Sequence, residues 1–429
     1  MTAFSGAGGF GGDFYAGYKH IYNPRRVAVL AYRNRPFFEK LAKMDMFEGD
    51  TYNHSIFFED PQGGSSNQQV AINQKQASSQ GARMVLNRGR EYQVISILNE
   101  EIAASRGDKG SLLRKKKHET DRIISEMARR MDIALHGSGC GVIASFTTGS
   151  SVATSTLFLD TPQLGVRFSI RQVLQCASTN NTNGTTNTLL GGGTYARITN
   201  RLVSAQTTAI TLDQNLNVAF PGIAASTQYF LLRNGDNLGF GINNFSGGVS
   251  GLQSWLPITA PVSGDSFWGF DRSVDVQRLS GTRYIAGNGE KYEATFQNAS
   301  AELMIQDANP SVILAHPLDC AKYSEELGNK VRYSAKEAGS TGFKPLLVQG
   351  QSGELELLPD PQVIPGTFYM LDMDTWWVNH LDGLPHLVED DGRPALREAT
   401  SDAIEIRWRG WYQLVCDAPG KNAVGAFSL

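Results

Sequence analysis

The stretch that decides the fold is Ser111–His136, which reads SLLRKKKHETDRIISEMARRMDIALH. Serine is a favoured residue at the start of a helix, and Gly137-Ser138-Gly139 directly after the stretch is a strong stop signal. The pattern predicts one long helix with an apolar stripe, because apolar side chains recur at spacings of three and four: Ile123, Ile124, Met127, Ala128, Met131, Ala134 and Leu135.

About a hundred residues of extended, polar and glycine-broken sequence come before this helix. A short helix is expected around Pro36–Met44, where a proline opens it. His54–Glu59 and Gln93–Leu98 have the composition of strands, and the sequence between them is polar, so together they predict a long two-stranded arm. Such a ribbon is marginal alone in water. We therefore expect residues 49–97 to become ordered only when they lie on another subunit.

Composition limits the class of protein. The 429 residues leave room for two or three domains, and the 45 glycines, more than the usual ~7%, favour a turn-rich β fold. The formal net charge of −3 gives no overall basic field to attract nucleic acid. The cysteines form no close pair, which predicts free, mostly buried thiols in a reducing compartment. No signal-peptide pattern and no membrane-spanning run is present, so we expect synthesis in the cytosol.

Residues 160–270, after the long helix, predict a separable β-rich lobe. Turn residues separate its four clearest strand-like runs, which are Phe168–Gln175, Ala196–Leu202, Thr208–Leu212 and Gln228–Leu232. Its polar Asn/Thr-rich loop around Asn180–Asn187 favours a position on an outer surface.

The last third of the chain predicts a mixture of helices and strands. Helices are expected from Glu290 to Asp307 and at Pro317–Leu327, and the chain closes on Ala403–Asp417, a run that predicts a long strand pair bent at Gly410. Five shorter strands are expected at Val312–Ala315, Val331–Ser334, Pro345–Gln349, Glu354–Leu358 and Thr367–Asp372.

This order of elements resembles the major capsid proteins of tailed bacteriophages, which have the Hong Kong 97 shell fold. Met127–Gly139 is similar to the end of the spine helix of that fold, and Pro310–Pro317 is similar to the strand that enters its axial domain. Arg407–Tyr412, followed by Cys416–Gly420, is similar to the closing strand of one phage subgroup. Residues 160–270 are extra to the minimal fold and resemble an insertion domain.

The resemblance implies an α+β protein of seven consecutive segments. They are an N-terminal arm (1–48), an extended β-hairpin loop (49–97), the spine helix with the peripheral domain (98–159), the β-rich insertion domain (160–270), a long helix of the peripheral domain (271–309), an axial α/β domain (310–395) and a returning peripheral strand (396–429).

The resemblance also implies a structural role: a viral shell subunit that forms pentamers and hexamers of an icosahedral capsid around double-stranded DNA. The subunit would be made and assembled in the host cytoplasm and end in the virion. Its expected partners are copies of itself, a separate scaffolding protein, a portal and a decoration protein, with weak nonspecific contact to DNA and none to membranes. An encapsulin-like cellular compartment remains the alternative within the fold. Outside it, a β-rich hydrolase and a tail-fibre or adhesin piece remain alternatives.

Candidate contact residues follow from charge and aromatic content. Arg114, Lys115, Lys116 and Lys117 form a basic run at the helix start, which favours acidic groups of a neighbouring subunit, then a solvated face, then DNA. Lys75 lies near the tip of the arm. Some members of the resembled family crosslink such a lysine to asparagine, but we expect noncovalent assembly. Trp408 and Trp411 are expected to be core or subunit-contact anchors.

No motif predicts catalysis, a cofactor or a metal. The glycines at 137, 139 and 141 follow a helix, whereas a dinucleotide-binding loop precedes one, so they predict a helix stop. The seven histidines include no HxH or HExxH motif, and no serine lies in a GxSxG elbow. We therefore expect no enzymatic activity.

Overall fold

The computed structural model describes residues 35–428 apart from 48, 50, 76–78, 99–108, 205, 240–246, 329–345, 390–395 and 398–399. Within the long helix it describes side chains from Arg122 onward. Most of the expected arm (1–48), the expected strand Val331–Ser334 and the side chains of Arg114–Lys117 lie outside the described residues. In the part of the chain that is described, no helix has the length and apolar character needed to cross a membrane.

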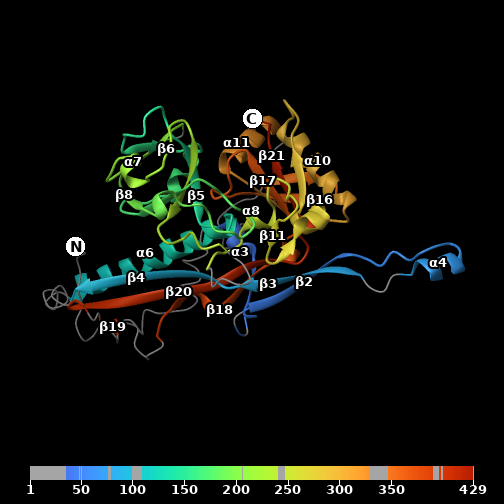
Figure 1. The fold of residues 1–429 in the computed structure, drawn as a ribbon, viewed down its shortest axis with the longest axis horizontal. Coiled ribbons are helices and arrows are strands. Elements are labelled where there is room, and N and C mark those ends of the chain that lie inside the picture. Colours follow the sequence, from blue (N-terminus) through green and yellow to red (C-terminus); the bar gives the residue numbers. More distant parts are fainter. Residues whose placement is uncertain are drawn as a thin grey trace.

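The base of the molecule is a long five-stranded sheet (Figure 1). Its central strand β20 (Ala403–Cys416) pairs antiparallel with β4 (Gly89–Leu98) on one side and β18 (Trp376–Leu387) on the other. β1 (Ala42–Met44) pairs parallel with β18, and β19 (Leu396–Arg397) pairs with β20. The prediction of a strand pair over Ala403–Asp417 is wrong. The run forms one strand because both of its edges find partners from distant parts of the chain.

The predicted long helix is confirmed as α6 (Lys109–His136), which lies along this sheet (Figure 1). Its apolar stripe is buried against β4 and β18, and Met127 and Met131 are fully covered. Gly410 of β20 permits this close packing, since a Cβ there would lie only 3.1 Å from Cε of Met127. A glycine in a strand interior often marks such a close approach.

The arm is confirmed, but with a different second strand. β2 (Thr51–Glu59) pairs with β3 (Gln80–Asn87), and a short helix α4 (Gln68–Gln74) forms the tip that projects away from the body (Figure 1). The expected partner Gln93–Leu98 instead belongs to β4, because its alternating side chains fit the helix-covered sheet. The base of the arm packs on the body through Ile56, Phe58, Ala82, Met84 and Leu86.

Six strands after α6 form a small antiparallel barrel with its own apolar core. They are β5 (Val142–Thr147), β6 (Thr156–Phe158), β7 (Val173–Ala177), β8 (Tyr195–Val203), β9 (Thr208–Leu212) and β10 (Gln228–Arg233), in the order β5-β10-β7-β8-β9-β6. A bridge between Phe146 of β5 and Leu159, just after β6, closes the ring.

The barrel runs from Val142 to Arg233, so its bounds differ from the expected 160–270. It begins earlier because the glycine turn after α6 leads straight into β5. It ends earlier because Leu252, Trp255 and Trp268 belong to the core shared by α6 and the long sheet. Residues 98–159 are therefore shared between the helix and the barrel.

A second unit consists of a six-stranded sheet with two helices. The strand order is β13 (Thr282–Ile285), β21 (Ala423–Ala426), β17 (Thr367–Leu371), β14 (Val312–Ala315), β16 (Gly353–Pro359) and β15 (Leu346–Gly350), and the helices are α10 (Tyr292–Ile305) and α11 (Pro317–Leu327). The barrel and this unit lie on the same side of the long sheet (Figure 1).

The segments expected to form the axial and peripheral domains exchange elements. Helix α10, expected in the peripheral domain (271–309), packs on the six-stranded sheet because Phe296 and Leu303 meet Tyr323 and Phe368. Strand β18, expected in the axial domain (310–395), belongs to the long sheet, and β21 from the last segment (396–429) joins the six-stranded one.

Short elements complete the fold. The helix expected over Pro36–Met44 ends at Lys40 and gives way to β1. The remaining short elements are α3 (Pro36–Lys40), α7 (Leu216–Ala219), α8 (Leu252–Trp255), α9 (Val276–Ser280), β11 (Ser266–Phe267), β12 (Phe270–Asp271) and 3-10 turns at Pro162–Arg167, Leu190–Gly192, Arg272–Asp275, Met373–Thr375 and Pro419–Lys421.

Candidate functional site

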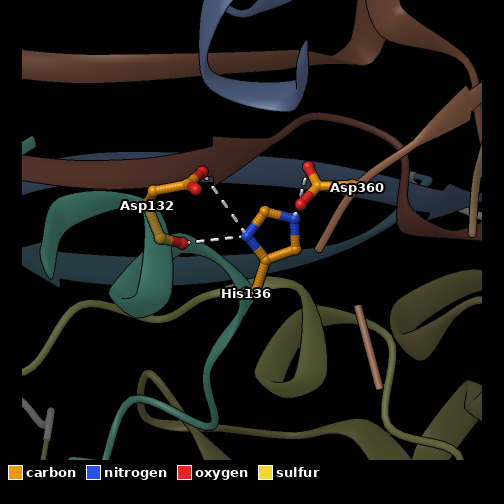
Figure 2. Close-up of side chains that lie close together, drawn as sticks. All are labelled: Asp132, His136 and Asp360. Atoms are coloured by element: carbon orange, nitrogen blue, oxygen red, sulfur yellow. Dashed lines mark hydrogen bonds and ion pairs between the residues drawn. The ribbon is translucent and has the colours of Figure 1, made fainter. Parts of the chain in front are cut away.

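Four buried charged side chains meet where the helix, the barrel and the six-stranded unit come together. Asp132 and His136 lie in the last turns of α6, Asp360 directly follows β16, and Arg167 ends the 3-10 turn of the barrel. Each is at most 4% exposed. We call these four residues the junction cluster. Figure 2 shows the imidazole of His136 between the carboxylates of Asp132 and Asp360.

The hydrogen bonds of His136 define its proton positions. Nδ1 lies 2.8 Å from the main-chain carbonyl oxygen of Asp132, and a carbonyl can only accept, so Nδ1 carries a proton. Nε2 lies 3.3 Å from Oδ2 of Asp360, an ion-pair distance rather than a short hydrogen bond. The Asp132 carboxylate is 3.8 Å from Nδ1, and the ring of Phe37 packs edge-on at 5.2 Å.

Arg167 connects the barrel to the turn that carries Asp360. Its Nε donates to Oε1 of Gln362 at 3.1 Å, one terminal nitrogen donates to the carbonyl of Ile143 at 2.8 Å, and the other donates to the carbonyl of Gln362. A guanidinium has several donors in a fixed geometry, which suits a buried contact between two parts of the chain. One side chain therefore holds the start of the barrel against the six-stranded unit.

The charges of the cluster stabilise one another. Burial alone would lower the pKa of His136, but the charges of Asp360 and Asp132 and the hydrogen bonds to these two residues together outweigh it and raise the pKa to about 9. Burial would raise the pKa of Asp360, but His136, the main-chain N–H of Gln362 and the charge of Arg167 together hold it below its ordinary value. Burial and the neighbouring Asp360 raise the pKa of Asp132 to about 7. Near neutral pH the cluster therefore contains an imidazolium, a guanidinium and an ionised Asp360.

Asp132, His136 and Asp360 are spaced closely enough to hold a metal ion, with candidate ligand atoms within 4.8 Å of one another. The charge balance does not favour one. Two carboxylates are matched by Arg167 and a protonated His136, whereas a divalent ion in place of the proton would leave an excess buried positive charge. The two ring nitrogens also face different partners (Figure 2). The arrangement fits a proton better than a metal.

A second set of contacts, made of ion pairs and hydrogen bonds, joins the barrel, the helix and the long sheet. Arg233 of β10 binds Glu91 of β4 through both carboxylate oxygens, at 2.8 and 2.9 Å. Arg130 of α6 donates to Gln93 at 2.6 Å. Arg129 donates to the barrel, to the carbonyl of Val166 and to Ser169, each at 2.9 Å.

These groups line a cavity of about 100 Å³ between the three elements. Of its arginines, Arg129, Arg130 and Arg233 are already paired with acids, amides or carbonyls, which favours a polar contact between units over an anion-binding site. The barrel is thus held to the rest of the molecule mainly by charged and polar contacts.

No known protein-family model matches the sequence, and no curated protein matches it. Among solved structures, a capsid protein in the asymmetric unit of cyanophage A-1(L) superimposes with a TM-score of 0.50 at 10% identity, covering 92% of this chain and 94% of that one. The chain has the Hong Kong 97 shell fold.

Two further solved structures superimpose with lower TM-scores. The capsid protein of a native GTA particle has a TM-score of 0.46 at 8% identity and covers 94% of this chain and 91% of its own. An encapsulin from Synechococcus elongatus has a TM-score of 0.44 at 9% identity and covers 95% and 90%.

The structure does not bring the predicted contact residues of this Hong Kong 97 fold together. Trp408 and Trp411 lie on β20, an odd number of residues apart, so they face opposite sides of the sheet. Trp408 is buried under α6, whereas Trp411 is half-buried on the other face and donates to the hydroxyl of Tyr92 at 3.0 Å. Lys75 is exposed after α4 at the arm tip, far from both.

The junction cluster was missed by the sequence reasoning, although a signal was present. Asp132 and His136 sit four residues apart, adjoining the apolar stripe positions Met131 and Leu135 of α6. Charged groups on a buried helix face are rare unless they are paired. That placement could have marked the end of the helix as a buried polar site, but nothing local identifies Arg167 or Asp360 as the partners.

Proposed function

We propose that this chain is the major capsid subunit of a virus and has a structural rather than an enzymatic role. It would assemble into pentamers and hexamers of an icosahedral shell that encloses double-stranded DNA. The observation that carries the proposal is the arm, whose tip projects past the body (Figure 1). Phe57 is 74% exposed, and Val70 and Ile72 at the tip are also exposed. Apolar groups held out on a ribbon fit a neighbouring subunit.

A second apolar surface supports the same proposal. Tyr92 and Val94 of β4 are exposed on the face of the long sheet that α6 does not cover. Trp411 lies on that face beside them, with the guanidinium of Arg409 4.2 Å from its ring. Aromatic residues with an arginine are typical of the centres of protein interfaces.

The proposal includes further partners. A separate scaffolding protein, a portal and a decoration protein would accompany the subunit, and packaged DNA would contact it weakly. Assembly would take place in the host cytoplasm. The encapsulin-like alternative would give a similar shell with protein cargo, so the contents of purified particles separate the two functions.

The arm gives the first test, by hydrogen exchange on the free chain and on assembled particles. The amides of α4 (Gln68–Gln74) should exchange fast in the free chain and slow down in the particle, because no buried residue anchors this helix to its own body. The amides of β2 and β3 serve as the internal control and should be protected in both states, since they are paired and packed on the core.

Equal exchange of the α4 amides in free and assembled chain would contradict the proposal that the arm docks on a neighbour. Protection of β2 and β3 only in the particle would instead show that the whole arm orders on assembly.

The basic run at the start of α6 gives a second test. Changing Arg114, Lys115, Lys116 and Lys117 together to glutamine should leave the fold nearly intact, because surface substitutions usually cost within about 0.5 kcal/mol each. Assembly should weaken, since a closed shell repeats a lost contact at every copy. Sedimentation velocity across a salt series measures how much assembly is lost and how it depends on salt. The variant at low salt should resemble the unmodified chain at high salt. If yield and salt sensitivity stay unchanged, the run is only a solvated face.

A further inference from the structure

The junction cluster lies where the helix, the barrel and the six-stranded unit meet. Asp132 and His136 belong to the helix, Arg167 to the barrel, and Asp360 to the six-stranded unit. The His136–Asp360 ion pair is a charged contact from the helix to the turn that follows β16. The six-stranded unit also shares apolar core with α6 through Leu358 and Val363, so the ion pair affects how firmly this turn, rather than the whole unit, is held to the helix.

Charged groups face the pair from every element around it. Asp132 lies on the same helix. Arg35, which precedes α3, acts on Asp132, and Arg167 from the barrel acts on both carboxylates. His316, before α11, interacts electrostatically with Asp360, and Tyr369 of β17 interacts electrostatically with Arg167. Arg167 keeps its charge well above neutral pH, and burial lowers the pKa of His316 below its ordinary value, so neither changes charge between pH 7 and 9.

We propose that protonated His136 is a lock between the spine helix and the turn at residues 360–363, and that loss of its proton loosens this turn from the helix. This proposal concerns the single chain and does not rest on the proposed shell function. It assigns a proton-dependent conformational role to a cluster outside every predicted contact surface.

The bonding of the ring explains the direction of the change. Nδ1 keeps its proton for the carbonyl of Asp132, so the proton lost is the one on Nε2. The lone pair left on Nε2 then faces Oδ2 of Asp360, and two acceptors 3.3 Å apart repel instead of attract. Asp360 stays ionised and buried but keeps only Arg167 as a counter-charge, which is a costly state. The donors of Arg167 are already used by Gln362 and Ile143.

The sign of the pH dependence follows from linkage. The pKa of His136 is raised from about 6.5 in the unfolded chain to about 9, so its stabilisation is complete below pH 6.5 and is lost as pH rises through 9. The pKa of Asp132 is raised to about 7, so its contribution also falls with rising pH, but mainly between about 4 and 7. Among the groups of the junction cluster, the window from pH 7 to 9 therefore reports His136.

Hydrogen exchange of the full-length chain between pH 6.5 and 9 tests the lock. The readout is the protection factor of the turn amides, which removes the intrinsic pH dependence of exchange. Two of these amides are bonded within the turn: Gln362 to the Asp360 carboxylate at 2.9 Å and Val363 to the Asp360 carbonyl at 3.2 Å. Protection should fall with pH, at most about tenfold per pH unit, as expected for release of one proton.

Two variants and a matched control separate the lock from general alkaline loosening. His136→Gln should remove the pH dependence between 7 and 9. Asp360→Asn removes the charge that raises the His136 pKa, so it should shift the dependence below pH 7 even if the glutamine variant folds poorly. The control is His54→Gln, a buried histidine on β2 whose pKa burial lowers, and it should keep the unmodified slope.

Three results would overturn the proposal. The first is unmodified chain whose turn amides keep constant protection from pH 7 to 9. The second is His136→Gln with the same slope as unmodified protein. The third is a rise in protection on adding Zn²⁺ that EDTA reverses and His136→Gln abolishes, because this would make the cluster a metal site instead.

Discussion

Replacing Arg167 with alanine is expected to destabilise the chain by about 3–5 kcal/mol, the usual cost of removing one partner from a buried charge network. The side chain is buried, and its loss leaves the carbonyls of Ile143 and Gln362 without donors. It also leaves the carboxylates of Asp132 and Asp360 with one positive charge fewer. Urea unfolding measures the cost, and limited proteolysis should show the barrel becoming separable before the rest unfolds.

Arg397→Ala is the matched control for that experiment. Arg397 is exposed and lies 3.9 Å from Asp402 on the surface, so its removal should cost within about 0.5 kcal/mol. Equal and small costs for the two arginine variants would mean that Arg167 does not hold the junction together.

Trp408→Ala and Trp411→Ala should have opposite consequences, although the residues lie three positions apart. Trp408 is 1% exposed beneath α6, and removing a buried tryptophan costs about 3–5 kcal/mol, so the single chain should lose stability. Trp411 lies half-buried on the other face, so its loss should change subunit stability much less and reduce assembly instead.

Urea unfolding of the free chain and sedimentation of assembled particles measure the two effects separately. A Trp411 variant that assembles as well as unmodified protein would remove this face of the sheet from the proposed contacts. A Trp408 variant with unchanged stability would contradict its place in the core.

Features set by local sequence could be predicted, and those set by distant pairing could not. The end of α6 followed from its apolar stripe and the glycines after it, although the helix begins at Lys109 rather than at the predicted Ser111. Strands such as β14 and β9 followed from short apolar runs. The choice of partner is not local. The local sequence of Gln93–Leu98 predicts an arm strand, but the segment pairs with β20, some three hundred residues later, in the long sheet.

The same limit explains why the domain bounds and the junction cluster were not found. Helix α10 shows an apolar stripe but not which sheet will cover it. Asp132 and His136 lie close in sequence and could be noticed. Asp360 lies more than two hundred residues away, and its pairing with His136 arises only when two units dock. A buried charge network of this kind is a property of the assembled tertiary structure.

Electron microscopy of the purified full-length chain, over a range of protein and salt concentrations, tests the central claim most directly. The proposed function predicts closed shells of uniform diameter built from pentameric and hexameric clusters, in which each arm lies across a neighbouring subunit. A chain that is folded by circular dichroism but stays monomeric, or forms only open aggregates, under all of these conditions would contradict it.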